Sequence, residues 1–153
     1  MVLTVSANCH RTINSCQHLD GEVALTRHIR VLVVDDQPRA RKSIKTLLAT
    51  WPDAGHVREA ANGREAIRLV EESQPDVVLM DVRMPEMDGI EATRLIKARW
   101  PQVKVIVLSM YPDYASDALE AKADSFFSKG MPPEELLATL AAVTANPKKE
   151  GLP

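Results

Sequence analysis

The sequence predicts an α/β fold in which a five-stranded parallel sheet lies between two layers of helices. Runs rich in Val, Ile and Leu recur along the chain, and the strongest are nearly continuous instead of alternating with polar residues. Such strands are buried on both faces, as in parallel sheets. Amphipathic helical patterns separate the runs, and strands joined through helices form right-handed crossovers within one sheet.

Five segments carry the strand pattern, three of them strongly and two more weakly. The strong segments are Ile29–Val34, Val77–Met80 and Val103–Leu108. Ser125–Ser128 is weaker, and His56–Ala60 is weaker still. All are far shorter than the roughly 20 apolar residues of a membrane-spanning helix. We therefore expect no membrane association.

Five helical patterns alternate with these strands. The first places Ile44, Leu47 and Leu48 at i, i+3 and i+4, which puts them on one face. Asp88, with Glu91 three residues later, has the spacing of a capping box. The first two expected helices begin after Pro38 and after Asn62-Gly63. The third runs from Asp88 to Trp100-Pro101, the fourth from Tyr114 to Ala121, and the fifth from Pro132-Pro133 to Asn146-Pro147.

The length of 153 residues and the hydrophobic content of 45% suit one ordinary core. Residues 29–146 hold all the predicted strands and helices, and we expect one domain there. Residues 1–28 show no strand or helix periodicity and are predicted to be a disordered N-terminal extension. Residues 147–153 are expected to form a short C-terminal tail.

Charge and cysteine content indicate which ligands and which cellular compartment to expect. The formal net charge of −2 gives no general attraction to nucleic acid. With two cysteines and no pattern of a signal peptide, we expect a cytoplasmic protein without a disulfide framework. The early Cys and His residues lack the spacing of a standard zinc module, which disfavours zinc binding; they are Cys9, His10, Cys16, His18 and His28.

Polar residues close the predicted strands, at the sheet edge where open parallel sheets bind ligands. They are Asp35-Asp36, Asp81, Ser109 and Ser128-Lys129. Each alone has a structural explanation, as a helix cap, a turn residue or a surface lysine. If the strands that end in Asp36 and Asp81 are neighbours, three carboxylates meet in one crevice.

Such a cluster must be neutralised, because two unit charges 4 Å apart repel by about 4 kcal/mol at an effective dielectric near 20. A raised pKa, the Lys129 ammonium or a divalent cation would each do so. Oxygen-only ligands suit Mg²⁺ or Mn²⁺ and not zinc. The cation, Lys129 and Ser109 could each bind one oxygen of a phosphoryl group. The residues therefore predict a phosphoryl-transfer site.

Four motifs resemble the receiver domain of two-component response regulators over about residues 29 to 146. They are Val33-Val34-Asp35-Asp36, the run from Leu79 to Gly89 (LMDVRMPEMDG), Val107-Leu108-Ser109 and Phe126-Phe127-Ser128-Lys129. The resemblance implies a flavodoxin-like (CheY-like) sheet with strand order 2-1-3-4-5. Arg83-Met84-Pro85, Leu108-Ser109-Met110 and the run from Lys129 to Leu136 further resemble the NarL/FixJ subfamily, whose members usually carry a C-terminal DNA-binding domain.

The resemblance implies a role for each site residue. Asp81 would accept a phosphoryl group from a sensor histidine kinase or phosphotransfer protein, and Lys129 and Ser109 would bind that group. Phe126 occupies the place of the switch aromatic. The implied Mg²⁺ ligands are Asp35, Asp36, Asp81 and the backbone carbonyl of Arg83. Phosphorylation would change the surface of the fourth helix, fifth strand and fifth helix and promote a homodimer. The output would be transcription, controlled through a DNA-binding domain that is absent from this chain. The chain would catalyse only its own phosphorylation and dephosphorylation.

The chain departs from the family pattern at several positions. Lys122 and Ser125 stand where the family often has Gly, and Lys122 falls where a helix C-terminal glycine would adopt a left-handed backbone. Phe126 lacks the hydroxyl of the commoner Tyr, which predicts a larger unphosphorylated active population. Arg83 and Tyr111 lie two residues after Asp81 and Ser109, and their size predicts a long-lived acyl phosphate.

Other functions stay open at the level of sequence. A stand-alone single-domain receiver fits the same residues. So does an interaction module that is never phosphorylated, but such a module is expected to lack Asp81 or Lys129, and this chain has both. A Mg²⁺-dependent phosphohydrolase is disfavoured because no second general acid and no covering lid are evident. Only ten residues follow Val143, so we expect no direct nucleic-acid binding by this chain.

Overall fold

The computed structural model describes residues 16–19, 22–25 and 28–145. Its main sheet has five parallel strands in the order β4-β3-β5-β6-β7, which is 2-1-3-4-5 when these five are numbered along the chain, and the predicted fold class is confirmed. The strands of this sheet are β3 (Ile29–Val34), β4 (Ala54–Ala60), β5 (Val77–Asp81), β6 (Lys104–Ser109) and β7 (Ser125–Ser128).

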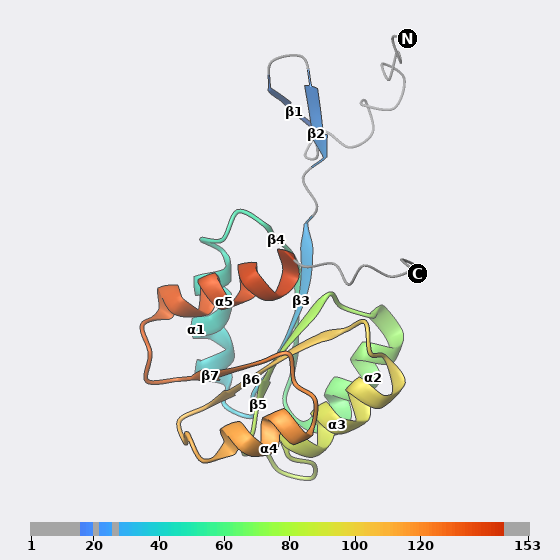
Figure 1. Cartoon of the computed structure of the whole chain (residues 1–153), viewed down its shortest axis with the longest axis vertical. Coiled ribbons are helices and arrows are strands. Elements are labelled where there is room, and N and C mark those ends of the chain that lie inside the picture. Colours follow the sequence, from blue (N-terminus) through green and yellow to red (C-terminus); the bar gives the residue numbers. More distant parts are fainter. Residues whose placement is uncertain (1–15, 20–21, 26–27, 146–153) are drawn as a thin grey trace.

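Five helices connect and follow these strands. Figure 1 shows α1 and α5 on one side of the sheet and α2, α3 and α4 on the other. Their bounds are α1 (Pro38–Leu48), α2 (Gly63–Ser73), α3 (Gly89–Arg99), α4 (Tyr114–Glu120) and α5 (Pro133–Ala145). In the part of the chain that the structure describes, no helix is long and apolar enough to cross a membrane.

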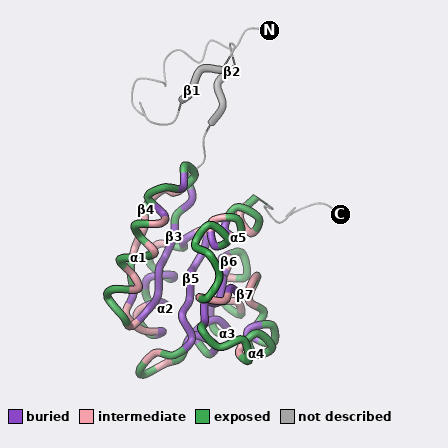
Figure 2. Tube along the Cα trace, turned by 90° about the vertical axis from the view of Figure 1, so that its left-hand side faces the viewer, coloured by how far each residue is buried: buried purple, intermediate pink, exposed green. Residues whose placement is uncertain are grey.

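The sheet divides the core into two halves, and successive residues of each strand face opposite halves. Val31, Val33 and Leu79 pack with α1 and α5, whereas Leu32, Val34 and Met80 pack with α2, α3 and α4. Figure 2 shows the central strands as continuous buried segments. Burial on both faces is the reason that their sequences read as unbroken apolar runs.

Two helix starts follow the capping rules, and one of them borders the end of β5. Asp88 Oδ1 accepts a hydrogen bond from the Glu91 N–H (2.9 Å), as its spacing predicts, and Asn62 does the same for Glu65 (2.8 Å). At Gly89 an added Cβ would lie 1.8 Å from the backbone oxygen of Asp81. Only glycine lets the start of α3 lie this close to the carboxyl end of β5.

Some predicted elements differ from the structure at their ends. β4 begins at Ala54, two residues before the predicted segment, and its start pairs with Ile29. Gly55 allows this approach because an added Cβ would lie 2.8 Å from the Cβ of His28. β6 is displaced by one residue toward Ser109, and α4 ends at Glu120.

The N-terminal segment contains two strands that the sequence analysis did not expect. β1 (Cys16–Leu19) and β2 (Glu22–Leu25) pair antiparallel, with Leu19 opposite Glu22. The intervening Asp20-Gly21 is a sequence signal for a two-residue hairpin turn, which the search for longer periodicity missed. Residues 1–15 of the predicted extension, with Cys9 and His10, and the predicted tail 147–153 lie outside the described residues.

Candidate functional site

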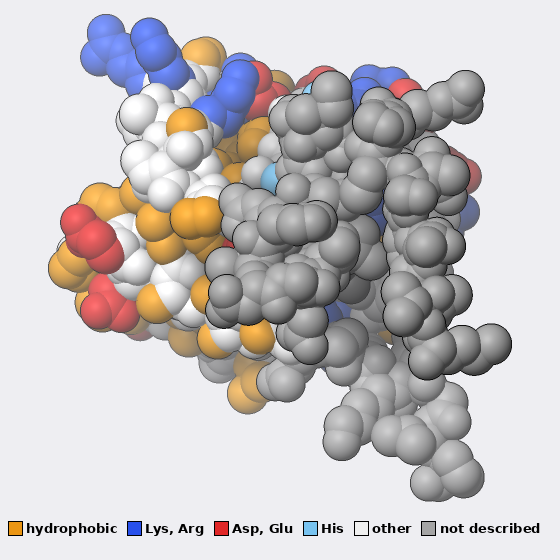
Figure 3. All heavy atoms as spheres, turned by 90° about the horizontal axis from the view of Figure 1, so that it is seen from above, with side chains coloured by type: hydrophobic (Ala, Val, Ile, Leu, Met, Phe, Trp, Pro, Cys, Tyr) orange, Lys and Arg blue, Asp and Glu red, His pale blue; other side chains and the backbone are white. Residues whose placement is uncertain are grey.

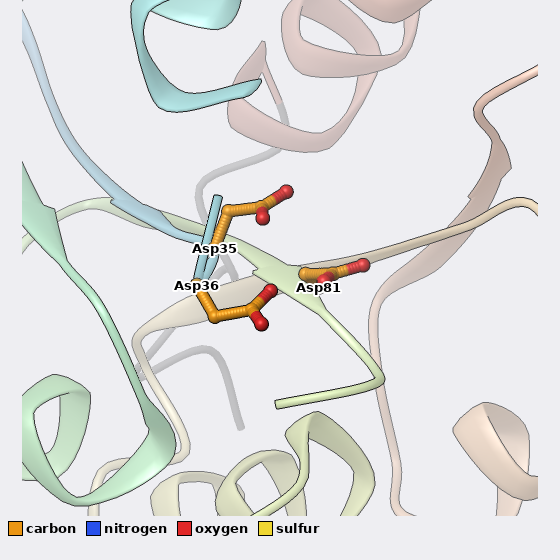
Figure 4. A group of neighbouring side chains, drawn as sticks. All are labelled: Asp35, Asp36 and Asp81. Carbon is orange, nitrogen blue, oxygen red and sulfur yellow. The ribbon is translucent and has the colours of Figure 1, made fainter. Parts of the chain in front are cut away.

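The three carboxylates predicted to converge do lie together. Asp35 and Asp36 follow β3, and Asp81 ends the neighbouring strand β5. One oxygen from each of the three lies within 4.8 Å of the others. Figure 4 shows the side chains entering the same space beyond the strand ends. The parallel topology therefore brings residues 45 positions apart in the sequence to one edge.

Every polar group of Asp35 has a partner. Its N–H donates to the Ala60 oxygen (3.1 Å), and its carboxylate accepts from the Gln37 N–H (2.9 Å) and from Lys129 Nζ (2.9 Å). Its backbone oxygen accepts from Arg41 Nη1 (2.6 Å). Asp35 is only 1% exposed, so these bonds replace the water that burial removes.

Lys129 bridges the two strands that carry the acids. Its Nζ lies 2.9 Å from Asp35 Oδ2 and 2.9 Å from Asp81 Oδ1. The Lys129 N–H also donates to the Ser109 backbone oxygen (2.9 Å), which ties the end of β7 to the end of β6. The predicted contact between Lys129 and the acidic cluster is therefore present.

Burial and neighbouring charge shift the pKa values of this pair. Burial raises the pKa of Asp81, helped by the charge of Asp35 and opposed by the hydrogen bond and charge of Lys129. For Lys129, burial alone would lower the pKa, but its bonds and charge interactions with Asp81 and Asp35 together raise it. Asp81 is thus a partly desolvated carboxylate beside a firmly protonated ammonium.

The donor set fits a hard divalent cation. Ionised, the three acids and Lys129 together carry two negative charges, which such a cation would neutralise. One oxygen from each acid lies within 4.8 Å of the others, and carboxylate oxygens are the ligands that Mg²⁺ prefers. Asp35, Asp36 and Asp81 could hold the ion, whereas the contribution of the Arg83 carbonyl stays a prediction.

Ser109 lies at the end of β6 beside the acidic cluster. It is 3% exposed, and its neighbour Leu108 pairs with Asp81 across the sheet. Its Oγ accepts a hydrogen bond from the Tyr111 N–H (3.0 Å). The hydroxyl proton is left for donation to a group bound at Asp81.

Arg83 and Tyr111 meet beside the site. The Arg83 guanidinium carbon lies 5.0 Å from the centre of the Tyr111 ring, within the range of a cation–π contact. The Tyr111 ring in turn meets the ring of Tyr114 edge to face at 6.3 Å between centres. A cavity of about 660 Å³ opens next to them, with Asp36, Arg83 and Tyr114 in its lining.

Phe126 is half-buried on β7. Its side chain packs against the core cluster that β3, β5 and β6 share with α2, α3 and α4. The structure thus brings together three predicted acids and the predicted lysine: Lys129 contacts Asp35 and Asp81, and Asp36 lies alongside. Ser109 flanks this group, and Phe126 belongs to the adjoining core.

Sequence reasoning missed the residues that hold Asp35 in place, which are Gln37, Arg41 and Glu59. Arg41 Nε pairs with Glu59 Oε1 (3.2 Å) while its Nη1 reaches the Asp35 oxygen. An arginine on an amphipathic helix is usually solvated, so the sequence held no signal for this contact. Gln37 acts through its backbone N–H, which any residue except proline supplies.

Comparison with known proteins gives a consistent result. The family described as the response regulator receiver domain matches residues 31–141. The uncharacterized transcriptional regulatory protein YhcZ of Bacillus subtilis is 42% identical over 113 residues, which cover 72% of this chain and 53% of that protein. The transcriptional regulatory protein DegU of Brevibacillus brevis is 37% identical over 117 residues, or 75% and 50% of the two chains.

A solved structure of a response regulator has a similar fold. A LuxR-family two-component response regulator from Aurantimonas sp. SI85-9A1 superimposes with a TM-score of 0.74 and 35% identity, over 77% of this chain and 86% of that chain. The chain spans about half the length of the curated relatives that it matches.

Proposed function

This chain belongs to the response regulator receiver domain family, and we propose that it is a switch controlled by phosphorylation of Asp81. The observation that carries the proposal is the network in which Lys129 Nζ contacts both Asp35 and Asp81, with Asp36 alongside. An acceptor carboxylate, an ammonium and a cluster suited to a divalent cation are the groups that phosphoryl transfer requires.

In the proposed reaction, an Asp81 oxygen attacks the phosphorus of a phosphohistidine on a sensor histidine kinase or phosphotransfer protein. The bond from phosphorus to the imidazole nitrogen breaks, the imidazole leaves, and an acyl phosphate forms on Asp81. Mg²⁺ or Mn²⁺ held by Asp35, Asp36 and Asp81 would neutralise charge on the transferring group. The attacking oxygen must be ionised, and Lys129 favours that form.

The new phosphoryl group would then be bound by the residues beside it. Lys129 Nζ, 2.9 Å from Asp81 Oδ1, needs only a short movement to pair with a phosphoryl oxygen. The Ser109 hydroxyl, which accepts from the Tyr111 N–H, can donate its own proton to another. Movement of Ser109 would shift the loop between β6 and α4. We propose that the Phe126 side chain then turns inward, as the switch aromatic.

The family and the relatives support a proposal for the output. YhcZ and DegU are both described as transcriptional regulatory proteins, and we propose that this receiver likewise controls transcription, with homodimer formation on phosphorylation. The chain would catalyse only its own phosphorylation and dephosphorylation, and would act in the cytoplasm, where a kinase domain can reach it.

Phosphorylation from a small donor tests the proposal. We expect intact mass measurement after incubation with acetyl phosphate and Mg²⁺ to show one added phosphoryl group. The increment should be absent from Asp81→Asn and from wild-type protein treated with EDTA. No increment in folded wild-type protein that binds Mg²⁺ would favour the alternative, an interaction module that acts without phosphate.

A further inference from the structure

The backbone carbonyl of Asp35 is held by a side chain from α1. Arg41 Nη1 donates to it at 2.6 Å, and Arg41 Nε lies 3.2 Å from Glu59 Oε1 on β4. The Arg41 side chain is only 17% exposed. Its guanidinium therefore spans from the strand beside β3 to the carbonyl at the end of β3, with few alternative positions.

Glu59 anchors the outer side of this guanidinium. Its second oxygen lies 2.9 Å from Lys45 Nζ, so one carboxylate receives two cationic side chains of α1. The hydrogen bond from Lys45 is the largest of the effects that lower the pKa of Glu59, and Arg41 adds to it. The carboxylate thus stays ionised and keeps Arg41 directed at Asp35.

The carbonyl that Arg41 holds belongs to the peptide group joining Asp35 to Asp36. The opposite side of Asp35 is fixed by the bond from its N–H to the Ala60 oxygen. Within the described part of the chain, the Asp36 carboxylate makes no hydrogen bond or ion pair of its own. The direction of the Asp36 side chain therefore depends on the orientation of this peptide group.

We propose that Arg41 is a positioning residue for the cation site, because it fixes the peptide that directs the Asp36 carboxylate toward Asp35 and Asp81. The inference rests on the proposed function only in requiring that the site bind a divalent cation. Groups that orient metal ligands typically change metal affinity 10- to 100-fold when they are removed. We expect the lower end of that range, about tenfold, because Arg41 acts through one ligand.

The direction in which cation affinity changes in Arg41→Met distinguishes a positioning role of Arg41 from an effect of its charge. Arg41→Met removes a positive charge near a cation site, which by Coulomb's law alone would strengthen cation binding. Loss of positioning would weaken it. Arg39 provides a matched control because it lies on the same helix and is exposed, so Arg39→Met makes the same change in charge without touching Asp35.

The test is titration with Mn²⁺ alone, with the free ion quantified by electron paramagnetic resonance. We expect Arg41→Met to bind Mn²⁺ about tenfold more weakly than wild type and Arg39→Met to stay within about twofold. Arg41→Lys keeps the charge but cannot reach both acceptors, so it should fall between them. Denaturant unfolding of each variant establishes that the titrated protein is folded.

Unchanged or tighter Mn²⁺ binding by folded Arg41→Met would overturn the inference while leaving the proposed function intact. Should Arg41→Met fail to fold, Arg41→Lys carries the comparison, and wild-type affinity in that variant would overturn the inference equally. Wild-type protein that binds no Mn²⁺ would overturn this inference, and the acetyl phosphate experiment would then decide separately whether Asp81 is phosphorylated.

Discussion

At the residue scale, the ionised form of Asp81 is disfavoured in the folded protein. Burial is the main reason that its pKa is raised, because a desolvated carboxylate favours the protonated form. In the unfolded chain the same group ionises near its ordinary pKa. As the pH rises through the window between the two values, the folded state releases its proton later and loses stability relative to the unfolded state.

The variant Asp81→Asn should therefore be more stable than wild type at pH 7 in EDTA, because it removes the disfavoured charge. The difference should shrink as the pH falls below the raised pKa of Asp81. Urea unfolding at several pH values measures it, with Asp113→Asn, at an exposed position, as the control. An Asp81→Asn protein that is less stable than wild type at pH 7 would contradict this account of the site.

Arg83 and Tyr111 were predicted from sequence to slow the loss of the phosphoryl group. Their contact across 5.0 Å, beside the loop that carries Ser109, is an arrangement that would obstruct water approaching Asp81. We expect the acyl phosphate to decay several-fold faster in Arg83→Asn and in Tyr111→Ala, where either change opens the contact. The decay of phosphorylated protein, followed by intact mass in EDTA, measures the rate. Slower decay in both variants would refute the prediction.

At the scale of elements, α4 is a short helix with little buried surface. Among its residues only Ala118 is buried, and Leu119 is 76% exposed. Met110 and Tyr111, in the loop that leads to α4, are also exposed. A helix with few buried contacts opens and shifts at low cost, which suits the element expected to change when Ser109 moves.

The end of α4 contains the strain that the sequence indicated at Lys122. Lys122 has a left-handed backbone (φ 67°), and its N–H bonds to Leu119 while the Ala123 N–H bonds to Ala118 (both 3.0 Å). These are the two bonds of a Schellman motif, which favours glycine at this position. A side chain there costs about 1 kcal/mol.

Lys122→Gly should accordingly raise the free energy of unfolding by about 0.5–1 kcal/mol, since the relief of strain exceeds the entropy that glycine adds to the unfolded chain. Lys42→Gly, at an exposed position within α1, is the matched control and should lower it by about 1 kcal/mol. Both are measured by urea unfolding. Destabilisation by Lys122→Gly would show that the lysine side chain contributes more than its backbone strain costs.

At the scale of the whole molecule, much of the fold was predictable because the central strands β3, β5 and β6 are buried on both faces. Unbroken apolar runs such as Val77–Met80 define the central strands, and the topology then brings Asp35, Asp36 and Asp81 to one edge. The cluster of three acids and Lys129 was predictable for that reason, since residues that end neighbouring parallel strands lie at the same edge of the sheet.

The rest depends on contacts that sequence patterns do not encode. Arg41 reaches Asp35 through the packing of α1 against β3 and β4, and nothing in its neighbours along the chain distinguishes it from Arg39. β4 has mixed burial and so a broken apolar pattern, which explains its misplaced start. The antiparallel strands β1 and β2 are only four residues each, too short for periodicity to reveal.

The described surface carries charges of both signs. The face in Figure 3 carries basic, acidic and hydrophobic side chains side by side where it is not covered by grey. This mixture matches the net charge of −2 over the chain. A net charge of this sign and size provides no long-range attraction to a polyanion.

The most direct test of the central claim is to identify the residue that carries the phosphoryl group. Borohydride reduces an acyl phosphate to an alcohol, so a phosphorylated aspartate becomes homoserine, which peptide mass spectrometry locates. After treatment with acetyl phosphate and Mg²⁺, we predict homoserine at position 81 alone, with Asp35 and Asp36 unchanged. Homoserine at either of those positions, or at none of the three in folded protein, would contradict the assignment of Asp81 as the acceptor.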